Sequence, residues 1–227
     1  MQLSFNFDFS DTKNEQEFVI SDANSAAWKF INNYDSSNPN LPKIFALCGN
    51  QNCGKTTLAR IWQKKMDAEF LSIKKLKNSN LINVIDTKSA YIIEDIDENS
   101  DEKTLLHIFN LINEKLDCLM LTSKKSLSQI DFKVKDLSSR MNNVFSIAIK
   151  NPDEELINLL LVKFFSDKQL NVEKRVIDFL VKNLPREYLE IFNFVKMVEF
   201  YVFEEKRKLT INFCKEILQK TARRIDY

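Results

Sequence analysis

Glycine is nearly absent from this sequence, and the place where it is kept is informative. Only two of the 227 residues are glycine, whereas a chain of average composition would contain roughly 16. Both belong to one segment, Gly49-Asn50-Gln51-Asn52-Cys53-Gly54-Lys55-Thr56-Thr57. Glycine permits tight turns and positive φ angles, so backbone amides can converge on an anion there. The segment is therefore a place where a phosphate group could approach the backbone.

Other absences exclude several classes of protein. No run of 18 apolar residues occurs, so no transmembrane helix is predicted. The N-terminus also lacks the basic start of a secretory signal. The formal net charge is only +1, so any contact with DNA is expected to be local or made through partners. The four cysteines form no C-x-x-C pair, which favours a reduced, cytoplasmic protein without a cysteine-bound metal.

The glycine segment matches the pattern G-x-x-x-x-G-K-[ST], the P-loop that binds nucleotide phosphates. An apolar run at 43–48 predicts a buried strand before it, and apolar residues at 58, 61 and 62 predict a helix after it. Lys55 would reach the β- and γ-phosphates, and the Thr56 hydroxyl would ligate Mg²⁺. The alternative is an ordinary turn between a strand and a helix.

Strand-like runs alternate with helical patterns up to about residue 150. Strands are predicted at 43–48, 69–73, 90–93, 118–122 and 144–149, and helices at 22–34 and 102–116. This alternation predicts an α/β fold with a parallel five-stranded sheet. Only helices are predicted afterwards, at 153–168, 172–184, 186–206 and 210–224, the last with Thr210 as its N-cap. The predicted organisation is a flexible arm at 1–14, an α/β core at 15–150 and a small all-helical lid at 151–227.

The third predicted strand ends in Glu94-Asp95 and resembles a Walker B segment. Carboxylates at this end of a central strand face the ligand crevice of an open sheet. Together with Thr56 they are the predicted Mg²⁺ ligands, and Asp95 is the residue predicted to polarise an attacking water. The usual order is aspartate then glutamate, so hydrolysis by this chain is left open. A solvated turn at the strand end is the alternative.

A P-loop core followed by a helical lid resembles the AAA+ ATPases. That resemblance implies that Thr122 or Ser123, at the end of the next strand, orients water near the γ-phosphate. It also implies that Arg186 contacts nucleotide from the lid and that Arg140 enters a neighbouring subunit's site as an arginine finger. Lys124 departs from the family, which often has an acid there. Salt-bridged surface residues are the alternative for the arginines, with Glu187 or Glu190 as the partner of Arg186.

The first residues contain Gln2-Leu3-Ser4-Phe5-Asn6-Phe7, which resembles the hexapeptide that docks bacterial replication proteins on the sliding clamp. Leu3, Phe5 and Phe7 would fill apolar pockets, and the Gln2 amide would bond at their rim. Phe5 departs from the usual leucine. The alternative is an edge strand that packs on the protein's own core. The eighteen phenylalanines in general are interpreted as core residues.

With the segments 136–140, 184–187 and 207–218, these features resemble the DnaA/Hda family of AAA+ proteins over nearly the whole chain. The resemblance implies binding of ADP or ATP with Mg²⁺ and docking on the DNA polymerase III sliding clamp. It also implies that Arg140 stimulates ATP hydrolysis by DnaA and so regulates replication initiation. The sequence ends just past the lid without a DNA-binding module, which favours the regulatory members over DnaA itself. A self-sufficient AAA+ ATPase, a P-loop kinase and self-association stay open.

Overall fold

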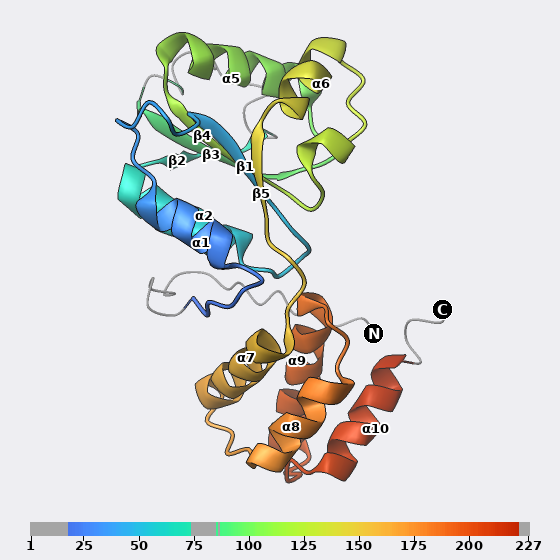
Figure 1. Ribbon diagram of the computed structural model, residues 1–227. Coiled ribbons are helices and arrows are strands. Elements are labelled where there is room, and N and C mark those ends of the chain that lie inside the picture. The colour runs from blue at the N-terminus through green and yellow to red at the C-terminus, as the bar shows by residue number, and fades with distance from the viewer. Residues whose placement is uncertain (1–17, 74–84, 86, 223–227) are drawn as a thin grey trace.

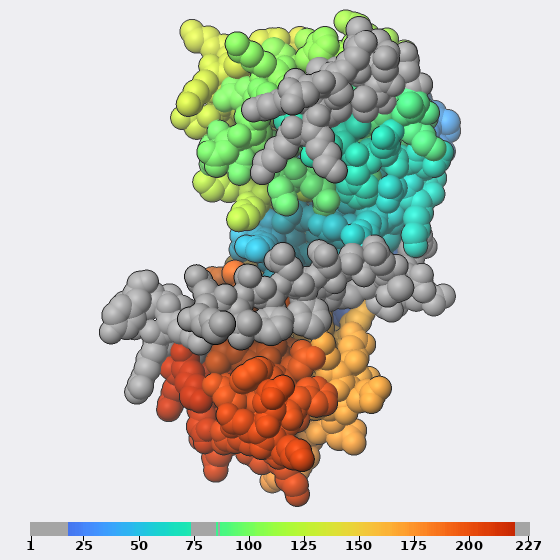
Figure 2. Space-filling model, turned by 180° about the vertical axis from the view of Figure 1, so that it is seen from behind, coloured from blue at the N-terminus to red at the C-terminus, as the bar shows by residue number. Residues whose placement is uncertain are grey.

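The computed structural model describes residues 18–73, 85 and 87–222, in which an α/β part precedes a helical part (Figure 1). From behind, the two parts form an upper and a lower lobe (Figure 2). The predicted clamp-binding residues Gln2, Leu3, Phe5 and Phe7 lie outside the described residues. None of the described helices combines the length and the apolar character needed to cross a bilayer.

The predicted five-stranded parallel sheet is confirmed. The strands are β1 (Ile44–Cys48), β2 (Glu69–Phe70), β3 (Ala90–Ile96), β4 (Cys118–Ser123) and β5 (Phe145–Ala148). Their order in the sheet is β2-β3-β4-β1-β5, and every neighbouring pair is parallel. All six residues of the central strand β4 are buried, which explains its continuous apolar run, since helices cover both faces of a parallel sheet.

Helices α1 (Ser25–Asn33) and α2 (Lys55–Met66) lie on one face of the sheet, and α5 (Glu102–Lys115) and α6 (Lys135–Asn142) on the other (Figure 1). Successive residues of a strand point to opposite faces. Phe45 of β1 accordingly packs in the same cluster as Trp62 of α2, while Ala46 belongs to the cluster that contains Phe109 of α5. A short 3₁₀ turn, η2 (Leu127–Gln129), follows β4.

The helical part consists of α7 (Glu154–Asp167), α8 (Lys174–Asn183), α9 (Tyr188–Glu204) and α10 (Ile211–Ala222). The described residues after β5 contain no strand, as predicted. These helices bury a core of their own, built from leucine, isoleucine, valine and phenylalanine side chains. Leu156 and Tyr188, in the first turns of α7 and α9, instead belong to a cluster of the α/β part. The Tyr188 hydroxyl also donates to the Lys150 carbonyl at 3.1 Å, so the helical part is attached through these two turns.

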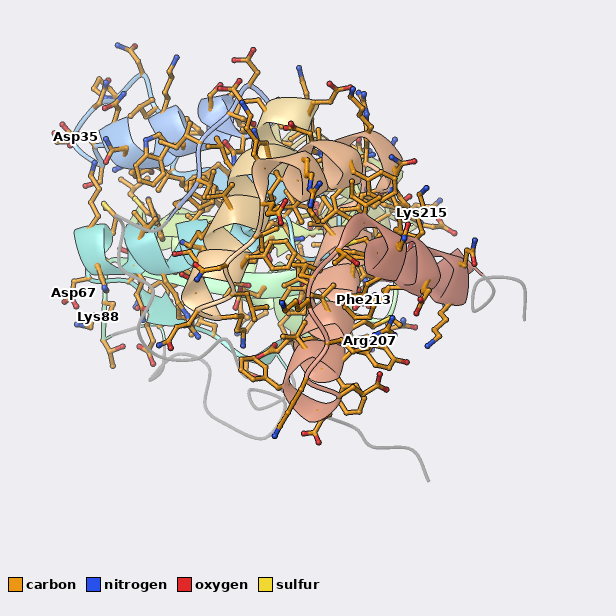
Figure 3. The ribbon with its side chains drawn as sticks, turned by 90° about the horizontal axis from the view of Figure 1, so that it is seen from below. Asp35, Asp67, Lys88, Arg207, Phe213 and Lys215 are labelled. Carbon is orange, nitrogen blue, oxygen red and sulfur yellow. The ribbon has the colours of Figure 1, made fainter. Side chains whose placement is uncertain are left out.

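Local hydrogen bonds and ring contacts fix the ends of the helices. The Asp153 carboxylate accepts the Leu156 N–H at 2.7 Å, and the Thr210 hydroxyl accepts the Phe213 N–H at 3.3 Å, which confirms Thr210 as an N-cap. Before α10, the Arg207 guanidinium lies over the Phe213 ring, 4.3 Å from its centroid (Figure 3). Helices α2 and α5 end differently, on residues with side chains at positive φ: Asp67 at +50° and Leu116 at +59°.

Two boundaries differ from the sequence prediction in a way that affects the site. Strand β3 continues through both acids to Ile96, with an irregular register between Ile93 and Ile96. Asp95 lies in that irregularity with φ +55°, a conformation rarely adopted by residues other than glycine, asparagine and aspartate. Helix α9 begins at Tyr188 rather than Arg186, because Glu187 has an extended backbone (φ −132°, ψ 127°) and forms the N-cap.

Candidate functional site

Both glycines of the P-loop occupy positions where a side chain would not fit. Gly54 has φ +99° and caps α2, and a Cβ there would lie 2.8 Å from the Phe18 ring. A Cβ at Gly49 would lie 2.8 Å from Cys53 Sγ and 3.0 Å from the Ile149 carbonyl oxygen. The loop therefore lies close to its neighbours between β1 and the start of α2, which is the context that a P-loop requires.

Lys55 begins α2 and folds back over the loop. Its ammonium group donates to the carbonyl oxygens of Gly49 at 2.7 Å and Asn50 at 3.0 Å, and the residue is only 7% exposed. The lysine is thus held at the N-terminal end of a helix, where the helix dipole adds positive potential. This combination of a lysine and free helix N–H groups suits an anion such as phosphate.

An open pocket of about 710 Å³ lies in front of this loop. It is lined by Gln51, Asn52, Gly54, Lys55, Thr56, Thr57, Arg60, Asp95, Ile96, Asp97, Glu98, Lys124, Lys125, Ile130, Phe164 and Phe192. Sequence reasoning missed the two phenylalanines, which come from α7 and α9, with their ring centroids 6.3 Å apart. It also missed Arg60, although Arg60 follows Thr56 by one helical turn and therefore lies on the same face of α2.

A smaller cavity of about 110 Å³ adjoins the pocket and is mostly apolar. Its lining includes Phe18, Val19, Leu160 and Tyr188, and it shares Phe164 with the larger pocket. The Phe18 ring stacks on Trp28, with centroids 5.3 Å apart and planes inclined by 7°. The site thus has a polar end at the P-loop and an apolar end beside it, which suits a ligand with a phosphate group and a flat, weakly polar ring.

The predicted metal ligands of the loop and of β3 lie in direct contact. The Thr56 hydroxyl donates to Glu94 Oε1 at 2.7 Å. Two oxygens that share an octahedral Mg²⁺ lie about 2.9 Å apart, so this pair fits a common cation. Across the described residues, no group of three or more His, Cys, Asp or Glu side chains is arranged to hold a metal. A Mg²⁺ here would therefore need phosphate oxygens and water to complete its coordination.

Asp95 lines the pocket, and its backbone is fixed by the next strand. Its N–H donates to the Thr122 hydroxyl at 3.0 Å. Thr122 is buried and does not line the pocket, so its observed contact is with the backbone of Asp95. The buried Ser123 hydroxyl is directed elsewhere, donating to the Lys125 carbonyl at 2.5 Å. The nucleotide role of Thr122 stays a prediction. The structure shows that its hydroxyl positions the backbone of Asp95.

The two predicted arginines lie outside the lining of this pocket. Arg140 Nε contacts Asp136 Oδ1 at 3.1 Å, and its guanidinium lies 5.6 Å from the centroid of the Phe109 ring. Arg186 precedes α9 and pairs with Glu154 of α7 at 2.7 Å, a partner the sequence reading did not name. The roles assigned to both arginines stay predictions.

Cys53 is the one residue of the P-loop with a shifted pKa. Desolvation raises the pKa of its thiol, and the nearby Lys55 opposes this shift only in part. The thiol is therefore protonated near neutral pH and a weak nucleophile. All four cysteines are buried and free of disulfides.

Comparison with known proteins gives distant relatives. No family model matches the chain. The chromosomal replication initiator protein DnaA of Buchnera aphidicola subsp. Cinara cedri is 25% identical over 230 residues, which cover 91% of this chain. The chain spans about half of that DnaA, 52% of its length. An uncharacterized protein of Haemophilus influenzae is also 25% identical over 197 residues, covering 77% of this chain and 81% of that protein.

Solved structures of low sequence identity share the architecture of this chain. Domain III of the Thermotoga maritima replication initiation protein DnaA superposes with a TM-score of 0.72 at 15% identity, covering 90% of this chain and 95% of that one. The fold is that of a DnaA-like AAA+ domain. DnaA from Aquifex aeolicus bound to AMPPCP gives a TM-score of 0.66 at 18% identity, over 83% of this chain and 65% of that one. The RuvB Holliday junction branch migration motor of T. maritima gives 0.57 at 14% identity, over 78% and 60%.

Proposed function

We propose that this DnaA-like domain binds an adenine nucleotide, docks on the sliding clamp and stimulates ATP hydrolysis by DnaA, as a regulator of the Hda type. The observation that carries the proposal is the position of Arg140. It lies on α6, outside the lining of its own pocket, while Lys55 and Thr56 of the P-loop line that pocket. An arginine that does not line its own nucleotide pocket is available to enter the pocket of a neighbouring subunit.

Nucleotide binding is the first step of the proposal. Lys55 and the N-terminus of α2 would hold the phosphates, and the Thr56–Glu94 pair would hold Mg²⁺, which would neutralise phosphate charge there. The apolar cavity beside Phe18 would accept the base. The fold neighbour from A. aeolicus was solved with AMPPCP, which supports an adenine nucleotide as the ligand.

The second step concerns Arg140. Its side chain is 36% exposed, and its ion pair with Asp136 joins residues one helical turn apart. Such exposed pairs contribute at most about 1 kcal/mol, so a phosphate of a neighbouring subunit could displace Asp136. A planar guanidinium suits the charge that develops on a transferring phosphoryl group. The Phe109 ring would hold the guanidinium in place meanwhile.

Clamp docking rests on the sequence of Gln2, Leu3, Phe5 and Phe7, outside the described residues. DNA would be approached through the DNA-loaded clamp rather than by this chain directly, in keeping with the net charge of +1. The clamp would thus bring Arg140 close to DnaA by raising its local concentration.

The test is ATP hydrolysis by DnaA, measured with this protein and DNA-loaded clamp. We expect strong stimulation by the wild-type protein, none by Arg140→Ala, and none after deletion of residues 2–7. Arg175→Ala is the matched control, because Arg175 is an exposed, ion-paired arginine of α8. Stimulation that survives Arg140→Ala would refute the finger role, and clamp binding that survives the deletion would refute the arm.

A self-sufficient AAA+ ATPase that loads or remodels replication proteins is the second candidate. Asp95 in the pocket favours it, because a carboxylate there could orient water in the chain's own site. A RuvB branch migration motor is also among the fold neighbours. Substantial ATP turnover by the protein alone, unchanged by DnaA and clamp, would decide for this candidate.

A further inference from the structure

The outer edge of strand β5 is open and carries an exposed aromatic side chain. The strand lies at one end of the sheet (Figure 1), paired with β1 on one side and with no described strand on the other. Three of its four residues are exposed, and Phe145 is 50% exposed. Natural proteins usually protect such an edge with charge or proline, because unpaired backbone groups recruit other strands. β5 contains neither a charged residue nor a proline, so its edge lacks this protection.

The opposite edge of the sheet is protected in the usual way. It is formed by β2, which has only two residues. One of them is Glu69, whose carboxylate accepts the Thr87 hydroxyl at 2.8 Å. A short strand with a charged residue does not invite pairing. The two edges therefore differ, and β5 is the one that is suited to accept a further strand.

The two faces of β5 differ in polarity. Ile147 is buried in the cluster that contains residues of α1 and α2, and the Phe145 ring lies 5.5 Å from the ring of Phe30 of α1. Ser146 and Ala148 are exposed, and they point to the opposite face because side chains alternate along a strand. A strand added at this edge would therefore need apolar side chains on the α1 face and polar side chains on the other.

Residues 3–9 of this chain have the required alternation. They read Leu-Ser-Phe-Asn-Phe-Asp-Phe, so every second residue is apolar, as in a strand with one apolar face. The described chain begins at Phe18, whose ring stacks on a tryptophan of α1. The Ala23 carbonyl accepts the N–H of Lys150 at 3.0 Å, so the start of the described chain lies beside the end of β5. Residues 10–17 could span up to about 28 Å, which is about twice the length of β5.

We propose that residues 3–9 add to the open edge of β5 as a sixth strand, with their apolar side chains beside Phe145. Backbone hydrogen bonds to β5 would hold the segment, and its phenylalanines would cover Phe145 and the adjoining surface of α1. Leu3, Phe5 and Phe7 are also the residues proposed above to fill the pockets of the sliding clamp. Where that clamp docking holds, β5 and the clamp compete for one segment, and the clamp-binding residues stay covered until a clamp is present.

The experiment is crosslinking of the full chain with a short bis-maleimide. The four native cysteines are buried, so cysteines introduced at the surface would react first. Ser146→Cys is combined in turn with Ser4→Cys, Asn6→Cys and Asp8→Cys, on the polar side of the added strand. The control pairs use Ser166→Cys instead, an exposed serine of α7. An unattached arm could reach it as well, because the start of the described chain and α7 border one cavity.

We expect at least one pair with Ser146→Cys to crosslink within one molecule about tenfold faster than the control pairs, because strand pairing raises the effective concentration of the two thiols. Equal rates for both sets would overturn the strand addition. Crosslinks between molecules in place of internal ones would assign the edge to a second copy and overturn it too. The double substitution Phe5→Ser and Phe7→Ser should lower the rate to that of the controls. An unchanged rate would refute the role of the apolar side chains.

Addition of excess sliding clamp tests the competition separately. We expect the internal crosslink to be suppressed as the clamp binds. A crosslink that forms unchanged in the clamp complex would overturn the competition. A wild-type chain that crosslinks internally but binds no clamp would refute the clamp docking proposed above and support the strand addition.

Discussion

The Thr56 hydroxyl and the Glu94 carboxylate are joined by a hydrogen bond of 2.7 Å, which links the start of α2 to strand β3. It is the first acid of the Glu94-Asp95 pair that meets the P-loop hydroxyl, while the second lines the pocket. The inverted order of the two acids therefore leaves a carboxylate on the metal side of the site. Compared with the usual order, the acid that lines the open pocket is the shorter aspartate instead of glutamate.

Replacement of Glu94 by glutamine tests whether Glu94 is the acid that holds Mg²⁺. Glutamine keeps an oxygen for Thr56 but removes the negative charge that Mg²⁺ prefers. We expect nucleotide affinity in Mg²⁺ to fall about tenfold and the affinity in EDTA to stay unchanged, measured by calorimetry. Glu155→Gln, in an exposed position of α7, is the control. A loss of the same size in EDTA would show that Glu94 does not act through a metal.

Replacement of Gly54 by alanine should destabilise the protein through two separable causes. A residue with a side chain at φ +99° is strained by about 1–2 kcal/mol, and its Cβ would collide with the Phe18 ring. We expect the free energy of unfolding, measured in urea, to fall by at least that strain. In the double variant with Phe18→Ala the collision disappears and the strain remains. Additive losses in the double-mutant cycle would contradict the contact between these two residues.

Arg186→Ala should separate a structural role from a nucleotide role. The Arg186–Glu154 ion pair is exposed, each side chain to 62%, so its loss should change the free energy of unfolding by less than about 1 kcal/mol. If the lid arginine reaches the nucleotide, ATP affinity should still fall clearly in the variant. The matched comparison is Glu154→Gln, which frees the arginine and should not weaken binding. Equal affinities in all three proteins would leave Arg186 with its surface ion pair alone.

Buried thiols should make the protein sensitive to alkaline pH. Burial in the helical core raises the pKa of Cys214 to about 12, and burial also raises that of Cys53. The unfolded thiols titrate at about 8.5, so above that pH the unfolded state loses protons that the folded state keeps. The free energy of unfolding should therefore fall by up to about 1.4 kcal/mol per pH unit for each thiol.

Urea unfolding between pH 7.5 and 10.5 measures this slope. Cys214→Ala should reduce it, because alanine does not titrate, whatever the variant's stability at neutral pH. A slope unchanged by the substitution would show that Cys214 is not the group responsible. Each protein is compared with itself over the pH range, so a loss of stability from the small cavity left by alanine does not affect the slope.

Much of the fold followed from short apolar runs, because a parallel sheet covered on both faces needs strands without polar alternation. The ends of elements were less predictable. The acids Glu94 and Asp95 suggested the end of a strand, but β3 includes them, since the Thr122 hydroxyl holds the backbone of Asp95. That contact joins positions 27 residues apart, and no local pattern in the sequence encodes it.

The site was predictable where a motif fixes its geometry and not where tertiary packing supplies it. Six residues of the P-loop line the pocket, Gln51, Asn52, Gly54, Lys55, Thr56 and Thr57, whereas Gly49, Asn50 and Cys53 do not. Phe164 and Phe192 were assigned to the core together with the other phenylalanines of the sequence. Their place in the pocket depends on how α7 and α9 meet the α/β part, which the linear sequence does not specify. Arg60 is different, since its one-turn spacing from Thr56 was available from the sequence.

The scarcity of glycine has a consequence away from the pocket. Helices α2 and α5 stop on Asp67 and Leu116, whose left-handed backbones glycine would adopt without strain. At Leu116, which is 74% exposed, that strain of about 1–2 kcal/mol outweighs the chain entropy of about 0.5–1 kcal/mol that glycine would cost. The end of α5 is therefore a place where the protein could be made more heat-resistant. The substitution Leu116→Gly would do so and leave every pocket residue unchanged.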